Sequence, residues 1–116
     1  MRVDVNDVEM DDDLKVYLRG EPFTGEVVEH DPDGRLIGLT TYFNGVEDGP
    51  SAAWYPDGTP RAKGEAVNGM GVGVHETWFP NGRLAAQDEF DGTGRHLARR
   101  RWDEAGELIE DKDYRP

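Results

Sequence analysis

The sequence predicts an all-β fold, a single-layer antiparallel meander of repeated β-hairpins, and two observations lead to this prediction. The first is a 24-residue repeat: residues 54–58 (Trp-Tyr-Pro-Asp-Gly) recur as residues 78–82 (Trp-Phe-Pro-Asn-Gly), with weaker copies that end at Gly34 and Gly106. A fixed period of this length is typical of repeat proteins. The second is a hydrophobic content of only 35%, which is too low for a thick core between two layers.

The turns follow from the glycines and their neighbours. In the Pro-Asp-Gly and Pro-Asn-Gly triplets, proline presets the first corner of a turn and glycine adopts a positive φ without steric cost. Such a triplet between two strands predicts a hairpin loop with a glycine bulge. Two further sets of glycines keep the same 24-residue step: Asn44-Gly45 with Asn68-Gly69, and Gly25 with Gly49 and Gly73. The predicted repeat turns end at Gly34, Gly58, Gly82 and Gly106.

The remaining elements follow in chain order. Residues 1–13 are acidic and form either a frayed arm or a short first strand around Val3 and Val5, and residues 14–116 form one repeat domain. Residues 14–18 alternate as a half-buried strand does, and residues 26–30 form a second strand. The return strands of the repeats are predicted at residues 35–43, 59–67, 83–91 and 107–114. The first two end at Asn-Gly, from which a short link reaches Gly49 or Gly73.

Aligning the repeats indicates which side chains form the core. Positions that repeat every 24 residues carry large apolar side chains, and two of these columns share the parity of one strand face. Each repeat therefore packs only on its neighbours. The predicted core is Trp54, Trp78, Trp102, Leu36, Leu84, Leu108, Tyr42 and Phe90.

Tyr55 and Phe79 follow the repeated tryptophans and are predicted to project from the opposite face. A row of large aromatic side chains on a single-layer sheet would be an exposed patch, which marks a partner site or a site of self-association. The other interpretation is that the sheet curls enough to cover both rows.

The chain is strongly acidic, with 25 acidic and 13 basic residues and a net charge of −12. Residues 1–50 carry a net charge of −9, and they include the run Asp11, Asp12 and Asp13. Such a field repels nucleic acid and anionic lipid and favours a basic partner, although acidic surfaces also keep small proteins soluble. The one basic cluster, residues 99–101 (Arg-Arg-Arg), is expected to pair with acidic neighbours or to anchor a polar partner group.

The sequence offers no catalytic, cofactor-binding or metal-binding residues, so we expect no enzyme activity and no cofactor. His30, His75 and His96 lie at unrelated positions of the repeat, and there is no cysteine to complete a metal site. Ser51 is the only serine, which leaves a Ser-His-Asp triad without support. No apolar stretch is long enough to cross a membrane, and the N-terminus lacks the apolar segment of a secretory signal. We therefore expect a cytoplasmic protein.

The repeat itself resembles a known family. The pattern Gly-Pro-x-x-x-Trp-Tyr-Pro-Asp-Gly-x-x-x-x-x-Gly, followed by Asn-Gly, resembles the variant MORN repeats of bacterial proteins over about residues 14–114. Residues 20–28 (Gly-Glu-Pro-Phe-Thr-Gly-Glu-Val-Val) are similar to the opening of YwqK-family proteins, which are classed as candidate antitoxins of toxin–antitoxin pairs. The resemblance implies an extended hairpin sheet that binds a protein and has no catalytic residues. The first and last copies depart from the pattern, as terminal repeats commonly do.

The sequence therefore suggests a non-enzymatic antitoxin or immunity-type protein that neutralises a cognate basic protein by occlusion. In this hypothesis Asp11, Asp12 and Asp13 steer the encounter, and Tyr55 and Phe79 supply the anchors. The alternative is a scaffold that self-associates as a homo-oligomer through its sheet face or edge strands. Lipid binding, proposed for some MORN proteins, is disfavoured by the acidic charge.

Overall fold

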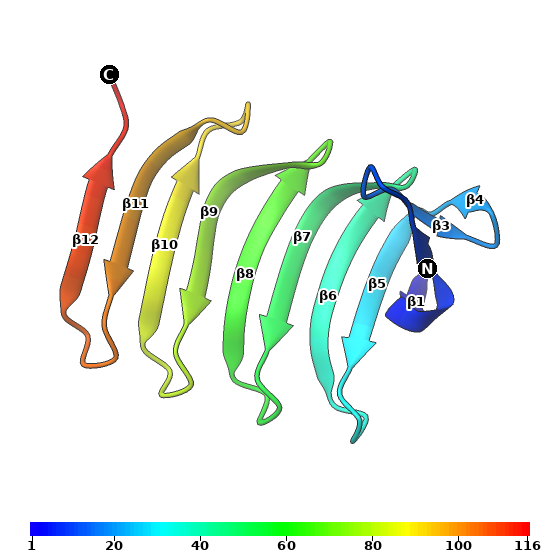
Figure 1. The fold of residues 1–116 in the computed structure, drawn as a ribbon, viewed down its shortest axis with the longest axis horizontal. Coiled ribbons are helices and arrows are strands. Elements are labelled where there is room, and N and C mark those ends of the chain that lie inside the picture. Colours follow the sequence, from blue (N-terminus) through cyan, green and yellow to red (C-terminus); the bar gives the residue numbers. More distant parts are fainter.

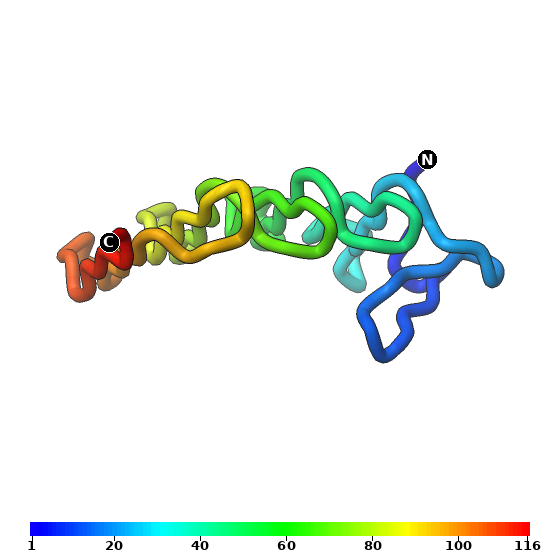
Figure 2. Tube along the Cα trace, turned by 90° about the horizontal axis from the view of Figure 1, so that it is seen from above, coloured from blue at the N-terminus to red at the C-terminus, as the bar shows by residue number.

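A computed structural model describes all 116 residues and shows an all-β molecule with two sheets. The large sheet has nine strands in the order β1-β5-β6-β7-β8-β9-β10-β11-β12, and from β5 onward neighbours in the sequence are neighbours in the sheet (Figure 1). The small sheet has the order β2-β3-β4. The molecule measures 46 × 39 × 21 Å, and the large sheet is a single layer (Figure 2). The predicted meander of hairpins is confirmed.

The strands match the predicted return strands to within about one or two residues at each end, which is the usual uncertainty of such boundaries. One short 3₁₀ helix, η1 (Val5–Asp7), interrupts the strands near the N-terminus. The strands are β1 (Arg2–Asp4), β2 (Glu9–Met10), β3 (Val16–Leu18), β4 (Glu21–Pro22), β5 (Gly25–His30), β6 (Leu36–Phe43), β7 (Val46–Trp54), β8 (Pro60–Val67), β9 (Met70–Trp78), β10 (Leu84–Phe90), β11 (His96–Trp102) and β12 (Leu108–Asp113).

Residues 1–13 are part of the folded structure. Val3 lies in β1, which pairs parallel with β5, whereas Val5 begins η1. Strand β2 pairs with β3, so the small sheet joins the acidic N-terminal segment to the repeat domain. Leu14, predicted to begin a strand, instead lies in the turn before β3 with a φ of 63°.

One five-residue turn occurs six times. In each copy the first residue donates its N–H to the carbonyl of the fifth, and the fourth donates its N–H to the carbonyl of the first. The fourth residue adopts a positive φ, which is why glycine recurs there. The predicted turn glycines have φ values of 84° (Gly34), 90° (Gly58), 87° (Gly82) and 89° (Gly106). The six turns begin at Asp11, Asp31, Tyr55, Phe79, Asp91 and Asp103.

The Asn-Gly pairs form two-residue hairpin turns at the opposite ends of the strands. Asn44 and Gly45 have φ values of 51° and 86°, and Asn68 and Gly69 have values of 50° and 82°. Two successive positive φ values are characteristic of the type I′ turn. The predicted links from these turns to Gly49 and Gly73 are wrong, because both glycines lie inside strands, β7 and β9. Gly49 has a φ of 115° and lies opposite a shift in the β6–β7 register, so a β-bulge accommodates it without ending the strand.

The buried core lies at the N-terminal end of the large sheet. Val16 and Phe23 pack against Val27 of β5 and Tyr42 of β6, and all four side chains are buried. We call the face of the large sheet that carries Val27 and Tyr42 the trough face. The small sheet covers this face at one end and protrudes from the plane of the large sheet (Figure 2).

The predicted repeat core is only partly confirmed. Of its eight residues, Tyr42 is the only buried one, at 9% exposed, and Leu108 is 50% exposed. The physical reason is that a single-layer sheet has no second layer to cover its faces, and Leu108 lies on an edge strand that has a neighbour on one side only. The remaining six are half-buried: Trp54, Trp78, Trp102, Leu36, Leu84 and Phe90.

Candidate protein-binding surface

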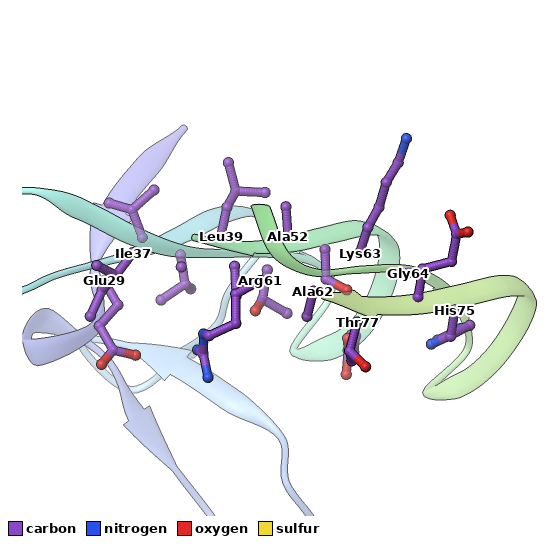
Figure 3. A pocket seen from close by; sticks show the side chains of 18 of the residues that line it. Glu29, Ile37, Leu39, Ala52, Arg61, Ala62, Lys63, Gly64, His75 and Thr77 are labelled. Atoms are coloured by element: carbon purple, nitrogen blue, oxygen red, sulfur yellow. The ribbon is translucent and has the colours of Figure 1, made fainter. Parts of the chain in front are cut away.

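An open trough with a volume of about 420 Å³ runs across the trough face of the central strands (Figure 3). Its side walls carry Glu29, Arg61 and His75, whose side chains point to this side of the sheet, whereas Lys63 points away. Its floor consists of small residues from three neighbouring strands, β6, β7 and β8: Gly38, Ser51, Ala53, Ala62 and Gly64.

The trough exists because small residues lie opposite one another. Ser51 pairs with Gly64, and Ala53 pairs with both Gly38 and Ala62, so no side chain on these strands fills the space above the backbone. His75 limits the trough on one side: its ring lies over Gly64, where an added Cβ would be 2.5 Å from Nδ1. The ring is held by its Nε2, which lies 2.9 Å from the carbonyl oxygen of Glu65.

A second cleft, of about 390 Å³, lies where the small sheet meets the Asn-Gly turns of the large sheet. It adjoins the trough, because Tyr42 and Glu47 line both. Met10 and Leu14 line it and are 56% and 69% exposed, and Asp13 adds a carboxylate. Burial, with a smaller contribution from the charge of Glu47, raises the pKa of Tyr42. We call this second cleft the N-terminal cleft. It combines exposed apolar side chains with negative charge.

The three aspartates at residues 11–13 have different roles. Asp11 is structural: its Oδ1 accepts hydrogen bonds from the N–H groups of Asp13 and Lys15, and its Oδ2 accepts one from the Tyr17 hydroxyl. The hydrogen bond from the Lys15 N–H is the main reason that the pKa of Asp11 is lowered. Asp12 and Asp13 are exposed and have no ion-pair partner, so only these two carboxylates are free to meet a partner.

The carboxylates of the N-terminal half are mostly unpaired. Among residues 1–50, ion pairs are formed by Asp4, Glu26, Asp31 and Asp33. Those without an ion pair are Asp7, Glu9, Asp11, Asp12, Asp13, Glu21, Glu29, Glu47 and Asp48.

The three arginines of the basic cluster at residues 99–101 form ion pairs within the chain. Arg99 and Arg101 reach Glu110 at 3.2 and 3.5 Å, and Arg100 reaches Asp111 at 3.4 Å. Of the two interpretations of this basic cluster, pairing with acidic neighbours across the sheet is confirmed. The excess of negative charge lies in the N-terminal half, because residues 1–50 carry a net charge of −9 and residues 51–116 a net charge of −3.

Tyr55 and Phe79 do not form an exposed aromatic row. Each is the first residue of a repeat turn and is half-buried. The Tyr55 hydroxyl donates a hydrogen bond of 2.6 Å to the carbonyl of Trp78, which ties one repeat to the next. Of the two interpretations, an exposed aromatic row is not supported, because the alternation of strand faces ends at the turns in which both rings lie. The larger apolar surface lies beside them, in a shallow hollow that includes Trp54, Trp78, Pro50 and Pro60.

The trough also contains the residue types of a hydrolytic triad, Ser51, His75 and Asp88, but these side chains are not hydrogen bonded to one another. His75 bonds to backbone carbonyls, and Asp88 lies 2.9 Å from Nε2 of His96. No group of three or more His, Asp or Glu side chains is arranged to hold a metal ion.

Neither the trough nor the N-terminal cleft was predicted from the sequence. The alternation of small residues at Gly38, Ser51, Ala53, Ala62 and Gly64 was the available signal for the trough. No local sequence pattern predicts the N-terminal cleft, because the cleft depends on where the small sheet packs.

In comparisons with known proteins, no family model, curated protein or solved structure matches this chain. None of the helical structure in the molecule has the length and apolar character needed to span a membrane.

Proposed function

We propose that this chain is a non-catalytic protein-binding module, an antitoxin or immunity-type protein that neutralises a cognate basic protein by covering its functional surface. The observation that carries the proposal is the N-terminal cleft, where Asp13 and Glu47 lie beside the exposed side chains of Met10 and Leu14. A basic loop with an apolar residue at its tip is the kind of ligand that this combination fits. The resemblance to variant MORN and YwqK-family proteins, and a cytoplasmic location, are parts of the same proposal.

The distribution of charge supports a division of labour. Residues 1–50 carry a net charge of −9, and nine of their carboxylates have no ion-pair partner. Unpaired carboxylates of one sign attract a basic partner over a distance and mainly raise the rate of association. Apolar side chains that lose water on contact then supply affinity. In this scheme the trough, which adjoins the cleft at Tyr42 and Glu47, accepts the chain that follows the inserted loop.

The test is affinity capture of the tagged protein from a lysate of the cells that encode it, at low and at moderate salt. We expect one stoichiometric basic protein that elutes as the salt concentration rises. That protein is then expressed alone and together with this chain, and the chain should rescue growth if its partner is toxic.

A matched pair of variants locates the site. Asp12→Asn/Asp13→Asn removes two free carboxylates beside the cleft and leaves Asp11, which holds the turn, in place. Glu104→Gln/Glu107→Gln makes the same change of charge at an exposed turn of the other end. The first variant should slow association several-fold at low salt, and the second should not. Equal rates for both variants, or no partner at either salt concentration, would contradict the proposal.

Self-association through Tyr55 and Phe79 is less well supported, because both rings are half-buried and the Tyr55 hydroxyl is bonded within the chain. Substituting the two residues by alanine is expected to lower stability without changing the oligomeric state.

A further inference from the structure

The C-terminal edge of the large sheet lies open. Strand β12 pairs with β11 on one side and has no neighbour on the other (Figure 1). Exposed strand edges are normally shortened, covered or blocked, because they pair with other strands. Here the edge strand has six residues, and three large apolar side chains at its ends are exposed: Leu108 (50%), Ile109 (65%) and Tyr114 (41%).

The hydrogen-bonding pattern shows which groups of β12 are free. The N–H of Tyr114 donates to the carbonyl of Leu97, so these two residues form a hydrogen-bonded pair of the antiparallel ladder. Such pairs alternate along a ladder, which places Lys112 in the next one, opposite Arg99. The backbone groups of the residues between them, Asp111 and Asp113, therefore point away from β11 toward the open side.

From this geometry we infer that β12 pairs antiparallel with β12 of a second copy of this chain, with Asp111 opposite its own symmetry mate. The two sheets then join edge to edge into one continuous sheet with a two-fold axis through Asp111. This inference is independent of the proposed basic partner, whose site lies at the other end of the molecule.

The register follows from the charges on β12. The two copies of β12 can pair only where residues with outward-pointing backbone groups lie opposite one another. This condition allows the two-fold axis to pass at residue 110, 111 or 112. Each centre places one residue opposite its own copy: Glu110, Asp111 or Lys112. The centres at residues 110 and 112 create no pair of opposite charge between the two copies of β12. The centre at Asp111 places Glu110 opposite Lys112 twice, and cross-strand pairs of opposite charge stabilise a sheet. It also brings Leu108 opposite Tyr114 and Ile109 opposite Asp113, so the exposed apolar side chains gather at both ends of the junction.

The charge of the chain favours this end for self-association. Two copies with a net charge of −12 repel one another, but residues 96–116 contain six acidic and five basic side chains. The acidic side chains of β12 are already paired: Glu110 with Arg99 and Arg101, Asp111 with Arg100, and Asp113 with Arg115. The two Asp111 carboxylates at the centre therefore meet with their charges compensated. At the other end the unpaired carboxylates would face each other.

Sedimentation equilibrium over a range of concentrations tests the inference. We expect the measured mass to approach twice that of the chain at high protein concentration. High concentration is needed because one pair of strands buries less than a standard interface of about 1,600 Å². Lys112→Glu places like charges opposite each other and should shift dimerisation to at least ten-fold higher concentration. Lys63→Glu makes the same change on the exposed surface of β8 and should have no effect.

A proline substitution tests the role of the backbone. Asp111→Pro removes an N–H that points outward, so the ladder with β11 keeps its hydrogen bonds while the edge loses a donor. This variant should be monomeric, with its strand content unchanged by circular dichroism. A mass that stays monomeric at all concentrations, or a dimer that neither Lys112→Glu nor Asp111→Pro weakens, would overturn the inference.

Cross-linking tests the register, because the chain contains no cysteine of its own. In an antiparallel pair, residues directly opposite have Cα atoms about 4.5–5.5 Å apart, which is within the range for a disulfide. Under mild oxidation Asp111→Cys should form a covalent dimer faster than Lys112→Cys or Lys63→Cys. Faster cross-linking of Lys112→Cys would contradict the register centred on Asp111. Asp12→Asn/Asp13→Asn should dimerise normally, which separates this interface from the proposed partner site.

Discussion

The two ends of the large sheet are stabilised in different ways. At the N-terminal end Val16, Phe23, Val27 and Tyr42 form a buried cluster, and the short strand β1 with η1 protects the sheet edge. At the C-terminal end β12 is uncovered. There ion pairs connect the strands, and so does a row of three rings. The centroid of the His96 ring lies 4.8 Å from that of Phe90 and 4.8 Å from that of Tyr114.

The comparison shows how a repeat protein with little apolar material divides its stability. A sheet one layer thick has no interior of its own, so the segment that folds back over one face creates the only place where aromatic side chains are buried. The rest of the sheet depends on neighbouring strands, because each repeat contacts only the next one. The N-terminal end should therefore govern global stability, and the C-terminal end should be lost first.

The largest effect is expected at the core. Phe23→Ala removes a ring that is 3% exposed and leaves a cavity, so the free energy of unfolding should fall by about 3–5 kcal/mol. Leu108→Ala at the open edge should cost less than about 1 kcal/mol, because that side chain is already half in water. Urea unfolding of both variants measures the difference. Similar losses would show that the two ends contribute equally.

Gly25→Ala should have the next largest effect. Gly25 has a φ of 140°, and an added Cβ would collide with the backbone carbonyl oxygen of Met1. We expect a cost of about 1–3 kcal/mol from backbone strain, together with detachment of β1 from β5. Hydrogen exchange should show faster exchange at the N–H of Glu26, which donates to the Met1 carbonyl. Gly92→Ala, where an added Cβ meets nothing and φ is not positive, is the matched control.

At the C-terminal end, Glu110→Gln should lower the free energy of unfolding by about 1 kcal/mol, since exposed and half-exposed ion pairs are each weak. Glu110 lies within 3.7 Å of three cationic groups, those of Arg99, Arg101 and Lys112. Glu104→Gln, which removes a carboxylate without an ion pair, should change little. High salt should reduce the difference between the two variants in urea unfolding, and a difference that is insensitive to salt would argue against an electrostatic cause.

The smallest effect concerns the two aspartates that hold equivalent turns at the two ends. The Thr93 hydroxyl and the backbone N–H groups of Arg95 and Thr93 lower the pKa of Asp91, and the N–H of Lys15 lowers that of Asp11. A lowered pKa stabilises the fold above the ordinary value of 3.8, and this stabilisation is lost as the pH falls through the folded-state pKa.

Asp91→Asn and Asp11→Asn each keep the accepting Oδ1 but cannot titrate. Each variant should therefore lose less stability than the unmodified chain between neutral pH and about pH 3. Thermal unfolding at both pH values measures the loss. If both variants lose as much stability at low pH as the unmodified chain, the acid sensitivity comes from other carboxylates.

The architecture could be predicted from the sequence because its determinants are local. A positive φ is required at Gly34, Gly58, Gly82 and Gly106, so glycine recurs there at a fixed spacing that reveals the repeat in the sequence. The Asn-Gly pairs indicate the other turns. The burial of the repeated apolar side chains could not be predicted. The same sequence pattern of strands is compatible with a sheet that has one covered face and with a sheet that has two open faces. The aromatic residues Trp54 and Trp78 fit a spine, yet in a single layer they stay half-buried.

The candidate site could be predicted only in part. The acidic run was evident, but the different roles of Asp11, Asp12 and Asp13 depend on the turn that precedes β3. The parallel pairing of β1 with β5 joins segments about two dozen residues apart and leaves no local pattern. Tyr55 and Phe79 were misplaced because a rule for strands was extended into turns.

The order of the strands also determines how the molecule responds to mechanical load. The two termini lie at opposite ends of the row of strands, so a pull on them acts across the strands and not along them (Figure 1). Hydrogen bonds loaded in this direction separate one row at a time, beginning at the end with the weaker packing. The chain would then peel away from β12 in steps, each repeat of 24 residues releasing about 80 Å of extended polypeptide at low force.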